Sequence, residues 1–316
     1  MISKLFLLVG LLACCMGTAP AEKKNILIIR GASTHGKDSH NNDEVGMLIK
    51  SKLENSQYAG QFDVKTTLNY PEDLSLVENA DLIIISSDGG GKHALVDKKD
   101  PTKHTRHLDG VLEKNKTGLI VIHWATDAPS GGMGQLQPEN AEMMMDWIGA
   151  VYYWVKKGQD PTSSWTWKFP VLELKVDKEH PISNGVPGSF QLQDEYYFNF
   201  FTAADGRNPG SDQVTFLHTA NAPSHRSDMT NKENWREQAC YWSFTRKGGG
   251  RSVAMTSAHM YHTWANPNFF QSFANSIFWT LEMEIPEDGV EIAPPTLEEL
   301  LSFGDTAIYR MARHFK

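Results

Sequence analysis

Short, uninterrupted runs of apolar residues mark the first half of the chain. Residues 26–29, 82–85 and 119–122 are apolar at every position, with a polar residue or a glycine on either side. Strands that are covered on both faces carry this pattern, whereas half-exposed strands alternate between apolar and polar positions. We therefore predict parallel strands of a buried β-sheet at these places, with a further strand at residues 62–68.

Amphipathic helical patterns separate these runs. Val45, Leu48 and Leu53 recur at helical spacing behind an Asn42-Asp43 start, and a second such pattern follows Pro138, a residue favoured in the first turn of a helix. Strands that alternate with helices indicate right-handed crossovers between parallel strands. The predicted fold class is therefore α/β, with a doubly wound, mainly parallel sheet.

The pattern changes after about Trp154. Residues 171–176 alternate between apolar and polar positions, and residues 191–201 are rich in aromatic side chains. Both segments are typical of antiparallel strands. Residues 214–218 and 252–256 are strand-like again, and we expect them to complete the main sheet.

The end of the chain carries two helix-start signals. Asn266 suits an N-cap and Pro267 the first position of a long helix whose apolar face would pack on the sheet. Beyond Pro294-Pro295, the capping-box pattern Thr296-Leu297-Glu298-Glu299 predicts a short terminal helix. We divide the chain into a leader at residues 1–21, an α/β domain at 22–285, and a linker with a short helix at 286–316.

The first residues resemble an export signal. Lys4 precedes an apolar run at residues 5–13, and Ala19-Pro20-Ala21 is the small-x-small pattern that signal peptidase reads. The run is too short to span a bilayer, so we expect no membrane span and a periplasmic or extracellular location. A competing pattern ends at Cys14, which could carry a lipid anchor. Simple cleavage would leave Cys240 without a partner for an internal disulfide.

Composition narrows the choice of partner. The chain has 316 residues, with 30 Lys+Arg against 38 Asp+Glu and a formal net charge of −8. Nothing here suggests the basic surface that neutralises phosphates, so nucleic acid is not expected as a partner. The 12 His, 9 Trp and 9 Tyr instead indicate a polar, aromatic-rich pocket for a small, neutral substrate.

Histidines follow several of the predicted strands. In open α/β sheets, ligands bind beyond the carboxyl ends of the strands. We therefore expect one site to gather residues that follow the strands: His35, His40, Asp88, His123, Trp124, His218, His259 and His262. Any one of these histidines taken alone is more often structural, but their shared placement favours a functional site.

Common cofactor and nucleophile motifs are missing from the sequence. It has no P-loop, no Gly-x-Gly-x-x-Gly after the first strand and no Gly-x-Ser-x-Gly elbow, so neither a nucleotide cofactor nor a hydrolase serine is expected. We interpret Gly89-Gly90-Gly91 as a loop that needs positive φ angles rather than as a phosphate cradle. We interpret His180 as part of a turn, without a catalytic role.

A carboxylate pair beside aromatic residues is the remaining feature. Asp194 and Glu195 precede Tyr196 and Tyr197, and Glu195 is the stronger site candidate. The rings of Trp124, Tyr196 and Trp264 either stack on a sugar or belong to the core.

Several short motifs, in this order, resemble the ThuA-like (trehalose utilisation) family over about residues 25–281. They are the His35 and His40 loop, Gly118-Leu-Ile-Val-Ile-His123, His180-Pro-Ile…Gly185, Asp194-Glu195-Tyr196-Tyr197, and Arg251-Ser-Val-Ala-Met-Thr-Ser-Ala-His259 with Trp264 and Phe269. The resemblance implies a flavodoxin-related, class I glutamine amidotransferase-like fold. It does not imply amidotransferase chemistry, because His123 stands where that fold would hold its nucleophilic cysteine.

The resemblance also implies a role in carbohydrate catabolism, in the cleavage of glycosides oxidised at the sugar C3 position. Such a reaction needs a base, an acid and a group that stabilises an enolate. We expect His123 and His259 to be base and acid, in either order, with Glu195 orienting them. His35 and His40 would orient them too; alternatively, His35, His40 and Glu195 would form a site of nitrogen and oxygen ligands for a divalent metal ion that stabilises the enolate. His35, His40, Asp88, Trp124, Tyr196, His262 and Trp264 are the expected substrate contacts.

Two alternatives remain open at this point. The first is a noncatalytic glycan-binding module that keeps the fold and the aromatic residues. The second is a different hydrolase that uses the same histidines.

Overall fold

The computed structural model describes residues 22–36, 38–132, 137–152, 163–166, 169–200, 214–223 and 226–303. The expected leader at residues 1–21, with Cys14, lies outside the described residues, as does the end of the 286–316 segment.

A nine-stranded mixed sheet organises the chain, in the order β2-β1-β3-β4-β11-β10-β9-β6-β7. Its parallel half consists of β2 (Phe62–Leu68), β1 (Lys24–Arg30), β3 (Leu82–Ser86), β4 (Gly118–Ile122) and β11 (Arg251–Met255). Its antiparallel half consists of β10 (Arg236–Thr245), β9 (Val214–Ala222), β6 (Val171–Val176) and β7 (Ser189–Gln193). The predicted α/β class with antiparallel additions is confirmed. The parallel half has the 2-1-3-4-5 order of flavodoxin-like sheets.

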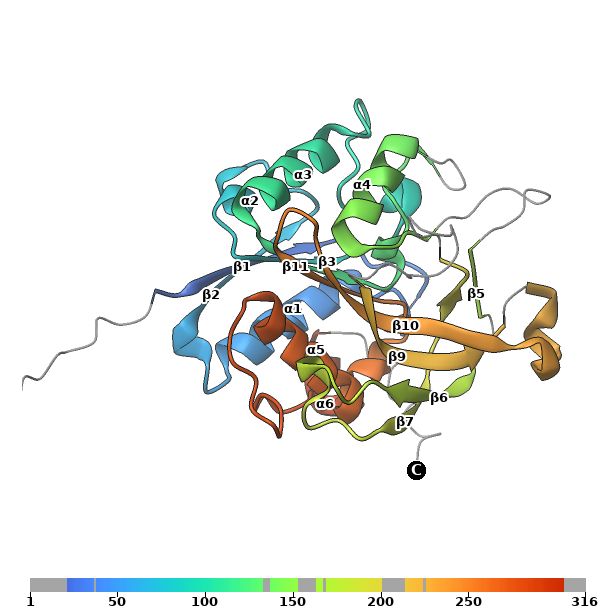
Figure 1. Cartoon of the computed structure of the whole chain (residues 1–316). Coiled ribbons are helices and arrows are strands. Elements are labelled where there is room, and N and C mark those ends of the chain that lie inside the picture. Colours follow the sequence, from blue (N-terminus) through green and yellow to red (C-terminus); the bar gives the residue numbers. More distant parts are fainter. Residues whose placement is uncertain are drawn as a thin grey trace, which may run out of the picture.

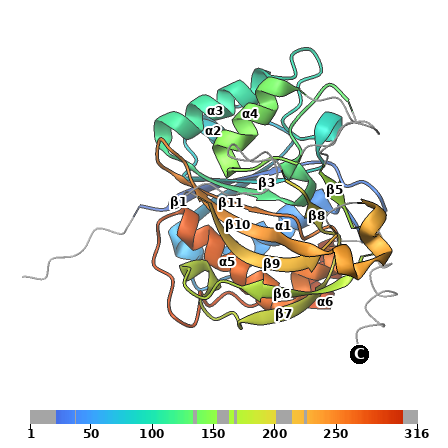
Figure 2. The ribbon, with the colours of Figure 1, turned by 45° about the vertical axis from the view of Figure 1, so that its right-hand side comes forward.

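Helices cover both faces of this sheet (Figures 1 and 2). One face carries α2 (Ser75–Glu78), α3 (Lys103–Asn115) and α4 (Pro138–Ile148), and the other carries α1 (Asn42–Glu54), α5 (Pro267–Thr280) and α6 (Leu297–Phe303). Successive strand residues therefore enter different cores: Ile26 and Ile28 pack on the α1 and α5 side, and Leu27 and Ile29 on the α3 and α4 side. This double burial explains why the runs are apolar at every position.

The predicted caps of the last two helices form as expected. The Asn266 side chain accepts hydrogen bonds from the backbone N–H groups of Asn268 and Phe269 at the start of α5. At α6, the Thr296 hydroxyl accepts from the Glu299 N–H, and the Glu299 carboxylate accepts from the Thr296 N–H. These bonds satisfy N–H groups that a helix start leaves without partners.

Smaller elements complete the described chain. A two-stranded sheet pairs β5 (Ser164–Trp165) with β8 (Tyr197–Phe198). The 3-10 turns are η1 (Ala59–Gln61), η2 (Gly90–Lys92), η3 (His123–Thr126), η4 (Pro181–Ser183), η5 (Arg226–Thr230), η6 (Lys232–Asn234) and η7 (Tyr261–Ala265). In η4, the His180 side chain caps the turn by accepting from the Ile182 N–H, which agrees with the structural role predicted for it.

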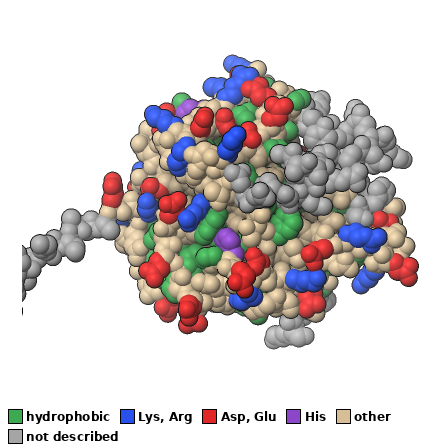
Figure 3. Space-filling model, viewed as in Figure 1, with side chains coloured by type: hydrophobic (Ala, Val, Ile, Leu, Met, Phe, Trp, Pro, Cys, Tyr) green, Lys and Arg blue, Asp and Glu red, His purple; other side chains and the backbone are tan. Residues whose placement is uncertain are grey.

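The surface shows no broad field of one charge on the face drawn in Figure 3, where the coloured acidic and basic side chains are interspersed. Among the described residues, no helix is both long enough and apolar enough to cross a membrane.

Candidate active site

The loops that follow β1, β3, β4 and β11 meet at the carboxyl edge of the parallel strands. They bring together His40, Asp88, His123 and His259, and Glu195 joins them from the turn between β7 and β8. Above these residues lies a cavity of about 470 Å³. Its walls are His35, His40, Gly89, Gly90, Gly91, Lys92, Trp124, Asp127, Gly132, Tyr152, Trp165, Glu195, Tyr197 and His259.

Unusual backbone angles aim three of the histidines into this region. His35, His40 and His123 have φ angles of 59°, 49° and 52°. Such left-handed conformations are uncommon outside glycine, and they cluster at functional sites. At His123 the chain leaves the buried strand β4 and turns at once into η3, which places the imidazole at the end of the sheet.

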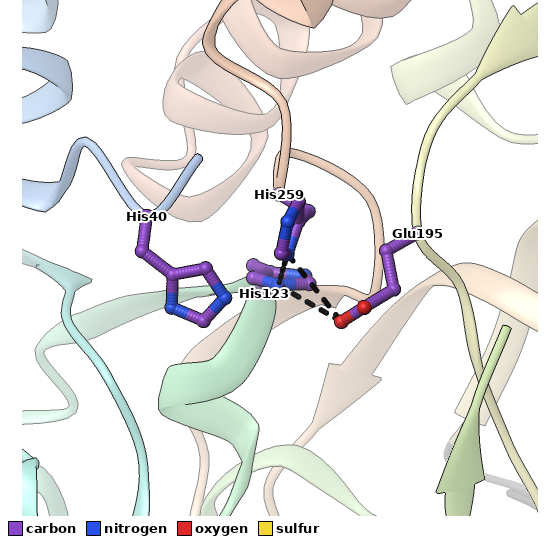
Figure 4. Close-up of side chains that lie close together, drawn as sticks. All are labelled: His40, His123, Glu195 and His259. Carbon is purple, nitrogen blue, oxygen red and sulfur yellow. Dashed lines mark hydrogen bonds and ion pairs between the residues drawn. The ribbon is translucent and has the colours of Figure 1, made fainter. Parts of the chain in front are cut away.

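Three side chains are in mutual contact at the floor of the cavity (Figure 4). The Nδ1 atom of His259 lies 3.3 Å from Nε2 of His123 and 3.4 Å from Oε1 of Glu195. The same Glu195 oxygen lies 3.7 Å from His123 Nε2. The His40 ring stands beside them, with its centroid 4.6 Å from that of His259 and 5.1 Å from that of His123.

The surroundings of His123 fix its tautomer. Its Nδ1 donates to the Thr256 carbonyl at 2.6 Å, so the lone pair is on Nε2, where the Tyr197 hydroxyl donates at 2.9 Å. Burial and the neighbouring His40 and His259 rings hold the pKa of His123 well below its usual range. For His259, burial lowers the pKa, but contact with Glu195 outweighs it and raises the pKa overall. The pKa values of the two imidazoles are therefore shifted in opposite directions.

Asp88 holds His40 in place. Its Oδ1 accepts from His40 Nδ1 at 2.6 Å and from Asn42 at 3.0 Å, and its Oδ2 accepts from Thr34 at 2.6 Å. Burial raises the pKa of Asp88, but these hydrogen bonds outweigh it and lower the pKa overall. The fixed Nδ1 leaves the other nitrogen of His40 turned toward His123 (Figure 4).

A second buried carboxylate, Asp194, shapes the loop that carries His259. Its two oxygens accept from the N–H groups of Glu195, Ala258 and Met260 and from the Thr263 hydroxyl, at 2.7 to 3.1 Å. One side chain thus positions both Glu195 and the loop after β11.

Asp127 forms part of the opposite wall. Its Oδ2 accepts from the Trp124 indole at 3.2 Å, and burial raises its pKa to about 8. Gly89 is needed here for space, because a Cβ at that position would lie 2.5 Å from the Asp127 Cβ. Of the three glycines Gly89, Gly90 and Gly91, only Gly90 has a positive φ, of 56°, so the expected need for positive φ applies to one of the three.

Most of the residues predicted for the site do meet there. His35, His40, Trp124, Glu195 and His259 line the cavity. His123 and Asp88 lie one layer below, in contact with lining residues; Asp88, predicted as a substrate contact, is buried and does not line the cavity itself.

Three predicted substrate contacts lie elsewhere, which corrects that part of the sequence prediction. Tyr196 is fully buried, and its hydroxyl donates to the Leu192 carbonyl. Trp264 packs in the core on the α5 side. His262 does not line the cavity, and its Nδ1 contacts Asp38 at 2.7 Å. None of the three stands where it would touch a ligand in the cavity.

Sequence reasoning also missed several wall and support residues. Tyr197 replaces Tyr196 at the site, and Asp127, Tyr152 and Trp165 complete the wall. Asp127 comes soon after β4 in sequence, so its position beyond the end of a strand could have marked it as a candidate site residue. The supporting role of Asp194 had no local signal, because its partners in the loop after β11 lie more than sixty residues away.

Two groups of side chains have the composition of a metal site. One consists of His40, His123, Glu195 and His259, and the other of His35, His40 and Asp88; within each group the candidate ligand atoms lie within 4.8 Å of one another. The predicted pair His35 and His40 belongs to the second group, and the first holds the residues predicted for catalysis.

The chain shares its fold with a solved structure. It is similar to a ThuA-like protein from Bacteroides uniformis, with 15% identity and a TM-score of 0.56 over 83% of this chain and 93% of that chain. Weaker likeness extends to the glutaminase domain of a Trypanosoma brucei CTPS, at 8% identity and a TM-score of 0.43 over 86% of this chain and 100% of that one. A Thermotoga maritima glutamine amidotransferase has 12% identity and a TM-score of 0.37, over 83% of this chain and 87% of that chain. No curated protein matches the sequence.

A family model establishes the relationship that the motifs suggested. The model for ThuA, described as trehalose utilisation, matches residues 25–280, which include every residue of the cavity wall. The chain is therefore a member of the ThuA family.

Proposed function

We propose that this protein is a carbohydrate-catabolic enzyme that cleaves glycosides carrying a ketone at C3 of the sugar. One observation carries the proposal: two imidazoles, whose pKa values are shifted in opposite directions, contact each other and a carboxylate at the floor of a cavity walled by aromatic rings. Aromatic walls with a few convergent polar groups are typical of small-molecule sites. Simple glycan binding does not require such a cluster.

The proposed reaction is an elimination followed by hydration. The C3 ketone acidifies the hydrogen on C2, so a base can remove that proton and leave an enolate. The enolate electrons then form a C1–C2 double bond as the C1–oxygen bond breaks, and the departing oxygen takes a proton from an acid. Water adds to C1, C2 regains a proton, and the result is net hydrolysis.

The geometry supports direct roles for Glu195 and His259, because both line the cavity. His123, expected as the partner of His259, contacts both from below and is 4% exposed. We assign the proton transfers to this three-residue set, with His123 acting through its contacts with the other two. General acid–base catalysis of this kind contributes about 10²–10⁴-fold for each group.

The walls fit a sugar ring. Trp124, Tyr152, Trp165 and Tyr197 surround the polar floor, and Asp127 adds a carboxyl group beside Trp124. Aromatic faces pack against the apolar C–H faces of sugars, while the polar groups hydrogen-bond to hydroxyls.

We also propose that the chain is exported. The leader pattern ends at Ala21, and β1 begins at Lys24, so cleavage after Ala21 would leave the sheet complete. Mass spectrometry of the mature protein tests this: a chain that begins at Glu22 supports export by simple cleavage, and a lipid on Cys14 supports the anchored alternative. A chain that keeps residues 1–21 contradicts both.

Product analysis tests the proposed reaction. Purified protein is incubated with 3-keto-trehalose and, separately, with unoxidised trehalose. We expect glucose and 3-keto-glucose from the first and no products from the second. If neither sugar is cleaved but both raise the melting temperature, the noncatalytic glycan-binding module is supported instead. Cleavage of both at similar rates indicates a different hydrolase.

A further inference from the structure

We propose that His40, His123, His259 and Glu195 bind one divalent transition-metal ion of the Zn²⁺ type at the floor of the cavity. The ion's role in turnover rests on the proposed function, but its binding does not. The four side chains come from the loops after β1, β4 and β11 and from the turn between β7 and β8, and Figure 4 shows them facing a common point.

The spacing of the donor atoms supports a tetrahedral site. Ligand atoms about 2.1 Å from a Zn²⁺ ion in a tetrahedron lie about 3.4 Å from one another. The three distances between His123 Nε2, His259 Nδ1 and Glu195 Oε1 are 3.3, 3.4 and 3.7 Å. The nitrogen that His40 offers completes the group, with all four donors within 4.8 Å.

The hydrogen bonds of the other ring nitrogens of His40 and His123 also support a metal site. Metal-binding histidines usually donate their other ring N–H to a carboxylate or a backbone carbonyl, which fixes the ring and directs the lone pair at the metal. His40 does so through Asp88, and His123 does so through the Thr256 carbonyl, each at 2.6 Å. The Tyr197 hydroxyl, 2.9 Å from His123 Nε2, adds an oxygen beside the same point.

The donor set selects the class of ion. Three imidazole nitrogens and one carboxylate suit Zn²⁺ and its first-row neighbours, whereas Mg²⁺ and Ca²⁺ prefer oxygen ligands. The alternative group of His35, His40 and Asp88 is less suited. Both carboxylate oxygens of Asp88 already accept hydrogen bonds from Thr34, Asn42 and His40.

A bound ion would change the roles of these residues in the proposed reaction. It would supply the positive charge that stabilises an enolate. His123 and His259 would then hold the ion, since their lone pairs are used as ligands. Proton transfers would pass to other groups of the wall, such as Asp127, which lines the cavity beside Trp124.

Metal titration tests the site without any substrate. The purified chain is treated with a chelator, dialysed, and loaded with Zn²⁺ or Mg²⁺, after which metal content and melting temperature are measured. We expect one bound Zn²⁺ per chain and a higher melting temperature with Zn²⁺, and neither with Mg²⁺. Glu195→Gln and His259→Ala should each weaken Zn²⁺ binding at least tenfold; Glu195→Gln preserves side-chain volume, which guards against misfolding.

His35→Ala is the matched control, because His35 lines the same cavity but belongs to the alternative group. It should keep one Zn²⁺ per chain. Substoichiometric Zn²⁺ in the loaded wild type overturns the proposal, and so does loss of Zn²⁺ in His35→Ala with retention in His259→Ala. A chain that binds Zn²⁺ but leaves 3-keto-trehalose intact keeps the metal site and contradicts the proposed function. Full cleavage of 3-keto-trehalose by metal-free protein would support the proposed function and contradict a role for the ion in turnover.

Discussion

The Nδ1 atom of His259 lies 3.3 Å from Nε2 of His123, although 136 positions separate the two residues in sequence. Two imidazole nitrogens at this distance need a proton or a cation between them, because their lone pairs would otherwise repel each other. His123 donates its Nδ1 proton to Thr256, so its Nε2 carries a lone pair, which faces both the His259 nitrogen and the Tyr197 hydroxyl. We therefore place the centre of the proposed reaction at this pair.

Asp88→Asn should lower turnover and Zn²⁺ affinity about 10- to 100-fold, which is typical when a carboxylate behind a ligating histidine is lost. The amide keeps the shape of the side chain but weakens its hold on His40. Steady-state rates and zinc titrations measure the effect. Asp38→Asn is the matched control, because it alters a comparable contact with His262 outside the cavity. Equal losses in both variants would contradict a specific role for Asp88.

Tyr197→Phe should lower turnover by up to about tenfold and cost about 1 kcal/mol of stability, because it removes the buried hydroxyl that contacts His123. Tyr196→Phe is the adjacent control. It removes a buried hydrogen bond to Leu192 and should cost about 1 kcal/mol of stability while turnover is kept. Rates and denaturant unfolding separate the two effects. A loss of turnover confined to the Tyr196 variant would show that the site has been misplaced.

Asp194→Asn should destabilise the fold by about 2–4 kcal/mol. The amide NH₂ would face N–H and O–H donors from Ala258, Met260 or Thr263, and a buried donor without an acceptor is costly. Urea unfolding measures the change. Glu237→Gln, which alters an exposed ion pair with Lys175, should shift stability by less than about 0.5 kcal/mol. A neutral Asp194 variant would contradict the anchoring role.

Acid should destabilise the protein partly through His218. This fully buried imidazole has its pKa lowered to about 3 by burial, so it stays neutral in the folded state while the unfolded chain takes up a proton below about pH 6.5. Its contribution to stability is thus present above pH 6.5 and falls by roughly 1.4 kcal/mol per pH unit as the pH drops toward 3. Urea unfolding between pH 7.5 and pH 5 should give a shallower decline for His218→Gln. An unchanged slope would contradict this prediction.

The strands and the site edge could be predicted because they depend on local patterns. Burial on both faces requires continuous apolar runs, and parallel strands place the residues that follow them at one edge. This rule explains why His40, His123 and His259 lie together in the folded protein, as the sequence predicted.

The failures came from features that a local pattern does not encode. Side chains alternate along an extended chain, so the choice between Tyr196 and Tyr197 depends on a pairing register with β5 that only the folded sheet defines. His218 lies inside the antiparallel strand β9, where its ring contacts Ser272 of α5, and not at the carboxyl edge. The Trp264 ring packs in the core and does not lie at the cavity, where a ligand would contact it.

Hydrogen exchange at C2 tests the proposed elimination most directly. A 3-keto-glycoside is cleaved in D₂O, and the released 3-keto sugar is examined by NMR and mass spectrometry, with a sample without protein to correct for spontaneous exchange. Removal of the C2 proton followed by hydration predicts deuterium at C2 of the product. Cleavage with the original hydrogen retained at C2 would contradict enolate formation and, with it, the role proposed for the histidine cluster.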